Sequence, residues 1–523
     1  MTHPDEHVDV LVVGAGPSGL TAAAALAREG VRALTIDRHP GTSTFPKATG
    51  VRLRTMEILR TWGLADQVSP DGGDVRLAMS VTPTLAGPQL DEVLLGVPHE
   101  GGTRDVSPAG FGFLAQDRLE PILLAHVREQ GGDVRFSTDL VGLRQGVNGV
   151  TARLRPLPGG PTYVVRADYL VGADGGSSTV RSHAGIGWRT LGSEGHHLAV
   201  LFRADLAPAL QGRSYALHRT VAPGSEGMFV ATGQDDRWVF DLEWEPDAGD
   251  ALGDWTPERI RQTLRAASGI PGLEPRVEGL FSWDFGAAVA DTQRSGRVFL
   301  VGDAAHRTTP RRATGMNTGI ADAHNLGWKL AWVAHGWAHP DLLDSYDAER
   351  RPVGLANARR SLEPAVGAAA EVDDLADDLG VVYRSHVIVS PGAEPARTDA
   401  IPGARAPHAW VERDGRRISM LDLYDGRFTV VIGPGGRRWR GAVRAIAAEG
   451  LPIHAVELGH DVADPGGRAA TRYRVGATDA ILVRPDGHVA WRHRGASGDL
   501  AALLREACDT ALGRRKGAAA MAG

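Results

Sequence analysis

Three glycines near the N-terminus have the spacing of a phosphate-binding turn. An apolar segment, Val8–Val13, runs into Gly14, Gly16 and Gly19, and an alanine-rich helix is expected to follow. In such a turn the first glycine allows a tight bend, the second lets the backbone approach a pyrophosphate, and the third lets the helix pack on the strand. A second apolar segment ends at Asp37, where a ribose hydroxyl needs an acceptor. Together these features predict a dinucleotide-binding βαβ unit.

A second segment places an acid at the end of a buried strand. Residues 297–302 read Arg-Val-Phe-Leu-Val-Gly, and Asp303 follows directly. Ligands of open α/β sheets bind at the carboxyl ends of the strands, so this carboxylate is a candidate ligand contact. Gly315 then opens a predicted helix, whose first backbone N–H groups and positive dipole end favour an electron-rich ring edge. The N1/O2 edge of an anionic reduced flavin has that character.

The elements that must position these turns form an α/β protein with three parts. The chain of 523 residues is too long for one hydrophobic core, so two or three domains are expected. We assign residues 1–75, 105–185 and 295–390 to a discontinuous Rossmann-like domain, and residues 76–104 and 186–294 to an inserted, mainly β domain that binds the substrate. We assign residues 400–512 to a thioredoxin-like α/β domain and residues 513–523 to a disordered tail.

The inserted domain contains a segment with strict alternation. Residues 237–244 read Arg-Trp-Val-Phe-Asp-Leu-Glu-Trp, which places Trp238, Phe240 and Trp244 on one face of a strand. Such a face is first of all the buried side of a sheet. The same aromatic side chains are also candidate contacts for an aromatic substrate.

Composition excludes several classes of protein. The formal net charge is -6, which does not favour nucleic acid or an anionic membrane surface as a partner. No apolar run approaches the roughly 20 residues of a membrane span, and Met1–His7 is too polar for a secretory signal. Cys508 is the only cysteine, so no intramolecular disulfide and no metal site are expected. These features favour a cytoplasmic protein, with a homodimer as a further possibility.

The motifs as a set resemble those of a known enzyme family. The glycine turn, the stretch Tyr-Leu-Val-Gly-Ala-Asp-Gly ending at Gly175, and the Gly302–Asp303 segment with Gly-Met-Asn at 315–317 are similar to the three motifs of single-component FAD-dependent aromatic hydroxylases. These are flavoprotein monooxygenases with a para-hydroxybenzoate hydroxylase-like fold. The long chain with its C-terminal domain resembles the subgroup that tailors polyketides, including antibiotics. The resemblance implies an NAD(P)H-consuming enzyme that hydroxylates a polycyclic or phenolic compound with O₂ through a C4a-hydroperoxyflavin.

The resemblance also implies which residues hold FAD. The pyrophosphate and ribose would be held at the first turn and its flanking segments, the adenine near a later strand, and the ribityl chain and flavin ring at the second and third motifs. The residues carried over are Gly14, Gly16, Pro17, Ser18, Gly19, Asp37, Arg38, Lys47, Arg54, Gln116, Leu140, Asp174, Gly302, Asp303, Pro310, Gly315, Met316 and Asn317. Lys47 stands where the family usually has an arginine, so it keeps the charge but loses the bidentate fork.

One loop departs from the family pattern. Family members commonly have a Pro-Pro-x-Gly-Gly-x-Gly-like sequence there, whereas residues 309–315 read Thr-Pro-Arg-Arg-Ala-Thr-Gly. Pro310 is retained where the loop would pass the reactive edge of the flavin, and Arg311 and Arg312 replace small residues. We therefore take Pro310 and Arg312 as candidate catalytic residues. An arginine here would pair with an acidic or phenolate substrate or point to solvent.

Three other functions stay open from the sequence. A related flavin enzyme could insert oxygen beside a carbonyl (Baeyer–Villiger type) or epoxidise a similar substrate. A flavin-dependent halogenase is disfavoured because a Trp-x-Trp-x-Ile-Pro stretch is absent from the sequence. An FAD-binding module that does not oxygenate has the altered loop as its only support. The sequence does not decide between NADPH and NADH.

Overall fold

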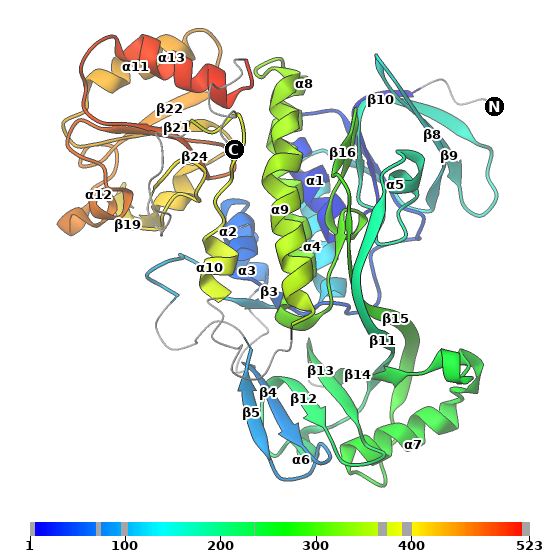
Figure 1. Cartoon of the computed structure of the whole chain (residues 1–523). Coiled ribbons are helices and arrows are strands. Elements are labelled where there is room, and N and C mark those ends of the chain that lie inside the picture. Colours follow the sequence, from blue (N-terminus) through cyan, green and yellow to red (C-terminus); the bar gives the residue numbers. More distant parts are fainter. Residues whose placement is uncertain are drawn as a thin grey trace.

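The computed structural model describes residues 6–68, 75–95, 103–234, 236–363, 374–389 and 400–514. Its central part is an α/β domain in which the long helices α8 (Gly315–Ala334) and α9 (Asp344–Ser361) lie side by side. A β-rich domain lies at one end of these helices, and a smaller α/β domain packs against their flank (Figure 1). Most of the predicted tail, residues 515–523, and residues 390–399 and 96–102 lie outside the described ranges.

The central sheet has parallel strands in its middle. Its path runs β16-β17-β10-β1-β2-β7, and β9 extends it by pairing antiparallel with the first half of β10 and with β8. The second half of β1, residues 10–13, is apolar and buried without a break, as expected for a parallel strand covered on both faces. The strands are β1 (Glu6–Val13), β2 (Ala33–Ile36), β7 (Asp133–Arg135), β8 (Thr138–Gly146), β9 (Gly149–Pro156), β10 (Tyr163–Gly172), β16 (Arg294–Ser295) and β17 (Val298–Leu300).

Helices and short strands complete this domain. Helix α1 packs on α8 and α4, and its small alanines allow close approach of the backbones. The remaining elements are α1 (Pro17–Arg28), α2 (Leu53–Thr61), α3 (Ala65–Val68), α4 (Gln116–Glu129), α5 (Thr179–His183), α10 (Asp374–Leu379), and the two-stranded pair β3 (Gly50–Val51) and β6 (Gly112–Phe113).

The second sheet is mainly antiparallel, in the order β18-β15-β11-β14-β13-β12-β4-β5. One face is covered by α7 (Pro257–Ser268), which Thr256 caps by accepting a hydrogen bond from Arg259 N–H and which ends at Gly269 in a left-handed conformation. The strands are β4 (Arg76–Thr82), β5 (Asp91–Leu94), β11 (Trp188–Arg203), β12 (Tyr215–Thr220), β13 (Gly227–Gln234), β14 (Arg237–Trp244), β15 (Arg276–Ala290) and β18 (His306–Arg307), with α6 (Ala207–Leu210) beside them.

The C-terminal domain has a thioredoxin-like arrangement. Strands β21 and β22 are parallel, β23 is antiparallel to β21, β24 is antiparallel to β23, and the order is β22-β21-β23-β24. The elements are β21 (Phe428–Ile432), α11 (Arg438–Ala447), β22 (Ile453–Glu457), α12 (Arg468–Tyr473), β23 (Ala480–Val483), β24 (Val489–His493) and α13 (Leu500–Ala511), with the hairpin β19 (Trp410–Arg413) and β20 (Arg416–Ser419). Burial raises the pKa of Cys508 in α13 to about 12, so this thiol is not a reactive thiolate.

A shared core joins the C-terminal domain to the central domain. Trp332 of α8 packs edge-on against Phe428 of β21, with ring centroids 5.0 Å apart. Next to this apolar contact, Lys329 and Arg484 both donate to the carboxylate of Glu349, and all three side chains are fully buried. The two domains therefore pack as one body at this interface.

Candidate functional site

The first glycine turn has one open side. Gly14 has φ +107°, and a Cβ there would lie 2.3 Å from the carbonyl oxygen of Ala173. A Cβ on Gly19 would lie 1.8 Å from the carbonyl oxygen of Gly14, whereas a Cβ on Gly16 would meet nothing within 4 Å. Two of the three glycines are thus needed for protein packing, and the space beside Gly16 is left for a ligand.

The start of α1 offers unused donors to that space. Gly16 is the N-cap residue and supplies no side chain to accept from the first-turn N–H groups, and Pro17 occupies the first position. These N–H groups and the positive end of the helix dipole favour a bound phosphate. The residues present therefore fit the pyrophosphate of FAD.

Asp37 holds the turn from the end of the next strand. One carboxylate oxygen accepts from Ala15 N–H at 2.7 Å, and the other accepts from His39 N–H at 2.8 Å. Arg38 beside it is exposed, and Leu140 is buried in the core below. The ribose and adenine roles of Asp37, Arg38 and Leu140 stay predictions.

The second motif lies against the first. Asp174 follows β10 and accepts from the Ser178 hydroxyl at 2.5 Å and from Val180 N–H at 3.0 Å, which fixes the start of α5. Arg181 of that helix donates to the carbonyl oxygens of Gly176 (2.8 Å) and Ala304 (2.9 Å). Arg181 therefore ties the second motif to the third. This role of Arg181 was not predicted, although an arginine close after the Ser-Ser-Thr run was an available signal in the sequence.

The third motif packs directly on the first. Gly302 has φ +60°, and a Cβ there would lie 2.4 Å from Oγ of Ser18, while a Cβ on Gly319 would lie 2.2 Å from the same atom. Gly302 N–H donates to the fully buried Asp322 at 3.2 Å, and Asp322 also accepts from His306 at 2.6 Å and from Arg350 at 2.7 Å. This buried carboxylate, which the sequence analysis missed, holds the turn in place.

Asp303 lies in the turn that follows β17. Its side chain is exposed, and none of the residues that the structure describes donates a hydrogen bond to it. Surrounding protein atoms reduce the hydration of the Asp303 carboxylate and so raise its pKa, and the charges of His306 and Lys47 oppose that rise. An accessible carboxylate without a hydrogen-bond donor among the described residues fits the ribityl hydroxyls of FAD, and Lys47 is close enough to interact with it electrostatically.

The N-terminus of α8 is likewise open. Thr314 provides no side-chain cap, so the N–H groups of Gly315, Met316 and Asn317 lack intrahelical acceptors. The Asn317 side chain accepts from Arg52 N–H at 2.9 Å and donates to the carbonyl oxygens of Gly50 (2.9 Å) and Ala313 (2.7 Å). The side chain thus holds the surrounding loops, and the helix start keeps donors for a flavin ring edge.

The departing loop has an unusual backbone. Arg312 has φ +67° and Ala313 has φ +49°, a left-handed region that disfavours residues with a Cβ. These positions correspond to the two adjacent glycines of the family pattern. Arg311 forms a bidentate ion pair with Glu194 of β11, with both N–O distances 2.6 Å, so its charge is already paired within the protein. Pro310 is exposed, and its role and that of Arg312 stay predictions.

Two further candidates lie in different surroundings. Gln116 donates to Glu120 at 2.7 Å, and Glu120 also accepts from Ser43 N–H at 2.5 Å. Arg54 donates to the carbonyl oxygen of Asp486 at 2.7 Å and to Glu57 at 3.1 Å, which directs it toward the C-terminal domain. These contacts do not bring Arg54 to the glycine turn, and its proposed pyrophosphate contact lacks support from them.

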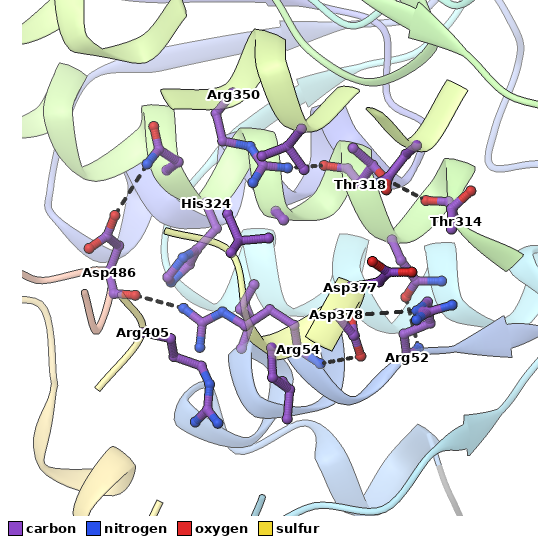
Figure 2. Close-up of a pocket in the computed structure, with 18 of the residues that line it drawn as sticks. Arg52, Arg54, Thr314, Thr318, His324, Arg350, Asp377, Asp378, Arg405 and Asp486 are labelled. Atoms are coloured by element: carbon purple, nitrogen blue, oxygen red, sulfur yellow. Dashed lines mark hydrogen bonds and ion pairs between the residues drawn. The ribbon is translucent and has the colours of Figure 1, made fainter. Parts of the chain in front are cut away.

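A pocket that includes several charged side chains lies between α2, α8, α9, α10 and the C-terminal domain (Figure 2). Figure 2 shows Arg52, Arg54 and Arg405 around it, with Asp378 and Asp486 as ion-pair or hydrogen-bond partners of the first two. The pocket touches the first turn of α8 at Thr314 but contains none of the three glycines of the first motif. It is therefore a feature of the domain interface and not the dinucleotide site.

The prediction that Trp238 and Phe240 contact the substrate is wrong. Trp238 and Phe240 lie in a core cluster with Leu264 and Ile260 of α7, and Phe240 is fully buried. Helix α7 covers this face, so neither side chain has surface to offer a substrate. Trp244, at the end of β14, is part-buried and donates from its indole to the carbonyl oxygen of Asp250. The opposite face of the sheet is the one directed to the central domain.

Comparison with known proteins agrees with this architecture. Residues 7–361 match the FAD binding domain family, and residues 399–514 match the family described as aromatic-ring hydroxylase, C-terminal. The chain is 39% identical to aklavinone 12-hydroxylase RdmE of Streptomyces purpurascens, over 96% of this chain and 98% of that protein. It is 35% identical to tetracenomycin A2 monooxygenase-dioxygenase of Streptomyces glaucescens, over 98% of both chains.

A solved structure shows the same fold with a cofactor. The ternary complex of aklavinone-11 hydroxylase with FAD and aklavinone has a TM-score of 0.87 and 37% identity, covering 98% of this chain and 100% of that chain. The fold and the three converging motifs define an FAD-dependent monooxygenase. The chain belongs to the FAD-dependent aromatic-ring hydroxylase family, as the resemblance of its motifs predicted. Within the described ranges no helix has the length and apolarity of a membrane span.

Proposed function

We propose that this enzyme hydroxylates a polycyclic phenolic compound, with NAD(P)H as electron donor and O₂ as the source of the oxygen atom. The central observation is the convergence of two uncapped helix starts and the unpartnered Asp303 around the contact of Ser18 with Gly302 and Gly319. The relatives named for aklavinone and tetracenomycin support a polycyclic substrate.

The roles of the chain's own residues follow from their positions. The α1 start and Gly16 would hold the pyrophosphate, Asp303 the ribityl hydroxyls, and the α8 start the electron-rich edge of the ring. When bound, FAD supplies the redox chemistry, accepting a hydride and activating O₂ for transfer to the substrate. The carboxylate of Asp322 keeps the Gly302 turn rigid, so Asp303 does not need to reorganise when the cofactor binds.

The test combines cofactor content with oxygen incorporation. The purified enzyme is incubated with NADPH or NADH, ¹⁸O₂ and a panel of hydroxyanthraquinones and related polycyclic phenols. We expect substrate-stimulated NAD(P)H oxidation and one ¹⁸O atom in the product, with NMR placing it on an aromatic carbon. An oxygen inserted beside a carbonyl or into an epoxide would contradict hydroxylation. Flavin-loaded enzyme that oxidises NAD(P)H without labelling any phenol would contradict the substrate class. The choice of electron donor and the expected homodimer stay predictions.

A further inference from the structure

A histidine–aspartate pair lies on the face of the second sheet that α7 does not cover. Nδ1 of His197 on β11 is 2.7 Å from Oδ2 of Asp241 on β14. The indole N–H of Trp283 on β15 donates to the other carboxylate oxygen at 2.9 Å. Asp241 is thus held by two donors from two neighbouring strands, and it can fix the orientation and tautomer of the imidazole. Among the described residues the hydrogen bond of the His197 ring is the one through Nδ1, and Nε2 has no partner there.

Two contacts direct this face toward the central domain. At one end, Phe45, in the segment between β2 and β3, packs on Phe281 of β15 with ring centroids 4.0 Å apart. At the other end, Arg311 of the loop before α8 lies 4.8 Å above the Phe285 ring. His197 lies between them, with its ring 4.9 Å from that of Phe285. The pair therefore lies on the face that meets the flavin-side loops.

The surface around His197 is aromatic and partly accessible. The Trp283 and Phe285 rings are each 4.9 Å from the imidazole, and both are only partly buried. Phe281, on the same face, is 38% exposed. An exposed set of aromatic rings beside a histidine with a free ring nitrogen is suited to a planar phenol, because the rings can stack on it while the nitrogen meets its hydroxyl.

We propose that His197 is the general base that removes the phenolic proton of the substrate. This inference rests on the proposed function and names a residue of the same site. The substrate O–H bond breaks, the proton moves to Nε2, and the electron pair stays on the phenolate oxygen, where it makes the ring more electron-rich. Asp241 is a positioning residue that stabilises the imidazolium through Nδ1–H. No oxidant or reductant takes part in this step.

Charged side chains from several elements lie near His197. Asp241 of β14 contacts it directly, and Glu243, its register partner on β14, shares the same face. Arg311, which lies over the same Phe285 ring that His197 approaches, is paired with Glu194 of β11. On this face Asp241 is therefore the carboxylate that contacts the imidazole directly.

The test measures ionisation of a bound phenol directly. The probe is 1,8-dihydroxyanthraquinone, whose phenolate absorbs at longer wavelength than oxidised flavin, and its dimethyl ether serves as the control without the proton. Holoenzyme is titrated with the probe across pH for the wild type, His197→Gln, Asp241→Asn and the matched control His460→Gln, an exposed histidine on the C-terminal domain. Turnover of the probe and flavin content are measured on the same samples.

We expect the pKa of the probe bound to the wild type and to His460→Gln to be at least one unit below the pKa of the free probe, so that it binds as the phenolate. The His197→Gln enzyme should lose that shift and about 100-fold in kcat, with KM within a few-fold and unchanged flavin content. The Asp241→Asn enzyme should lose part of the pKa shift and part of kcat. In His197→Ala, added imidazole should restore turnover.

Three results would overturn the proposal. These are wild-type enzyme that does not bind the probe, a wild-type shift that persists in His197→Gln, and wild-type kcat in His197→Gln. Failure of the proposed function has a different signature, because it appears in the wild type as missing FAD or missing oxygen incorporation, whatever residue is at position 197.

Discussion

Arg484 and Glu349, which are 135 residues apart in the chain, form a fully buried bidentate ion pair with N–O distances of 2.7 and 3.0 Å. Glu349 belongs to α9 of the central domain and Arg484 to the turn between β23 and β24. Burial raises the pKa of Glu349, but the charges of Arg484 and Lys329 outweigh it and hold that pKa well below its usual value. The pair therefore fixes the C-terminal domain against the helices that carry the flavin-side motifs.

Breaking this pair should release the interface. In Arg484→Met, Glu349 keeps Lys329 but loses two charged hydrogen bonds in a fully buried site, which typically costs about 3–5 kcal/mol. We expect a lower free energy of unfolding and faster proteolysis between the domains, measured by denaturant titration and limited trypsin digestion. Arg505→Met, which removes an exposed pair with Glu449, is the matched control and should cost below about 1 kcal/mol. Equal effects of the two substitutions would contradict the role of burial.

Asp303→Ala should weaken FAD binding without unfolding the protein. The Asp303 carboxylate has no hydrogen-bond partner among the described residues, so its removal breaks no hydrogen bond within that part of the chain. Loss of hydrogen bonds to a charged group costs about 1.5–3 kcal/mol, which is about 10- to 100-fold in Kd. Flavin fluorescence quenching on titration of apoprotein measures this, with the exposed Asp414→Ala as control. A mutant that retains wild-type affinity would remove Asp303 from the cofactor site.

The left-handed backbone of the loop before α8 predicts that a glycine at position 313 does not destabilise the protein. Ala313 has φ +49°, where a Cβ costs about 1 kcal/mol that glycine does not. Ala313→Gly should therefore raise the free energy of unfolding, or leave it level after the entropic cost of glycine. The matched change Ala502→Gly, in the exposed part of α13, should lower it by about 1 kcal/mol. Denaturant melts of both variants check this, and a destabilised Ala313→Gly would contradict the strain.

Stability should fall as the pH drops below 6.5. Burial lowers the pKa values of four histidines: His218 to about 4, His324 to about 3, His408 to about 4 and His488 to about 4. The unfolded chain binds these protons at higher pH than the folded one, so the folded state loses stability between pH 6.5 and 4.

For His218 the full effect is about 3 kcal/mol. The variant His218→Gln cannot bind this proton, so its free energy of unfolding should vary less with pH over that window. The exposed control His7→Gln should keep the wild-type slope. Parallel pH profiles for wild type and His218→Gln would contradict the assignment.

The local part of the site was predictable from the sequence. The bend at Gly14, the close contact at Gly19 and the acid after β17 follow from residues that are neighbours in the chain, and the structure places them as expected. Contacts between distant segments were not predictable in this way. Asp322 and Gly302 are separated in the chain by a loop and the start of a helix, and no periodic pattern in the sequence indicates that they form a hydrogen bond.

The sequence predicted substrate contacts on the wrong face of β14, and this error has a physical explanation. Alternation in residues 237–244 shows that two faces differ but not which one meets another domain. The larger aromatics, Trp238 and Phe240, are on the side that α7 covers. The functional face instead carries Asp241, whose partner His197 comes from a strand 44 residues away. A polar residue between two apolar ones on a predicted strand was the available signal.

The central claim is that the glycine turn, the Gly302–Asp303 turn and the α8 start converge on one FAD molecule. The most direct test is the flavin stoichiometry of the purified chain, determined from its visible absorption spectrum and from FAD titration of the apoprotein. The account predicts a yellow protein that binds one FAD per chain. A colourless chain that does not bind added FAD would contradict it.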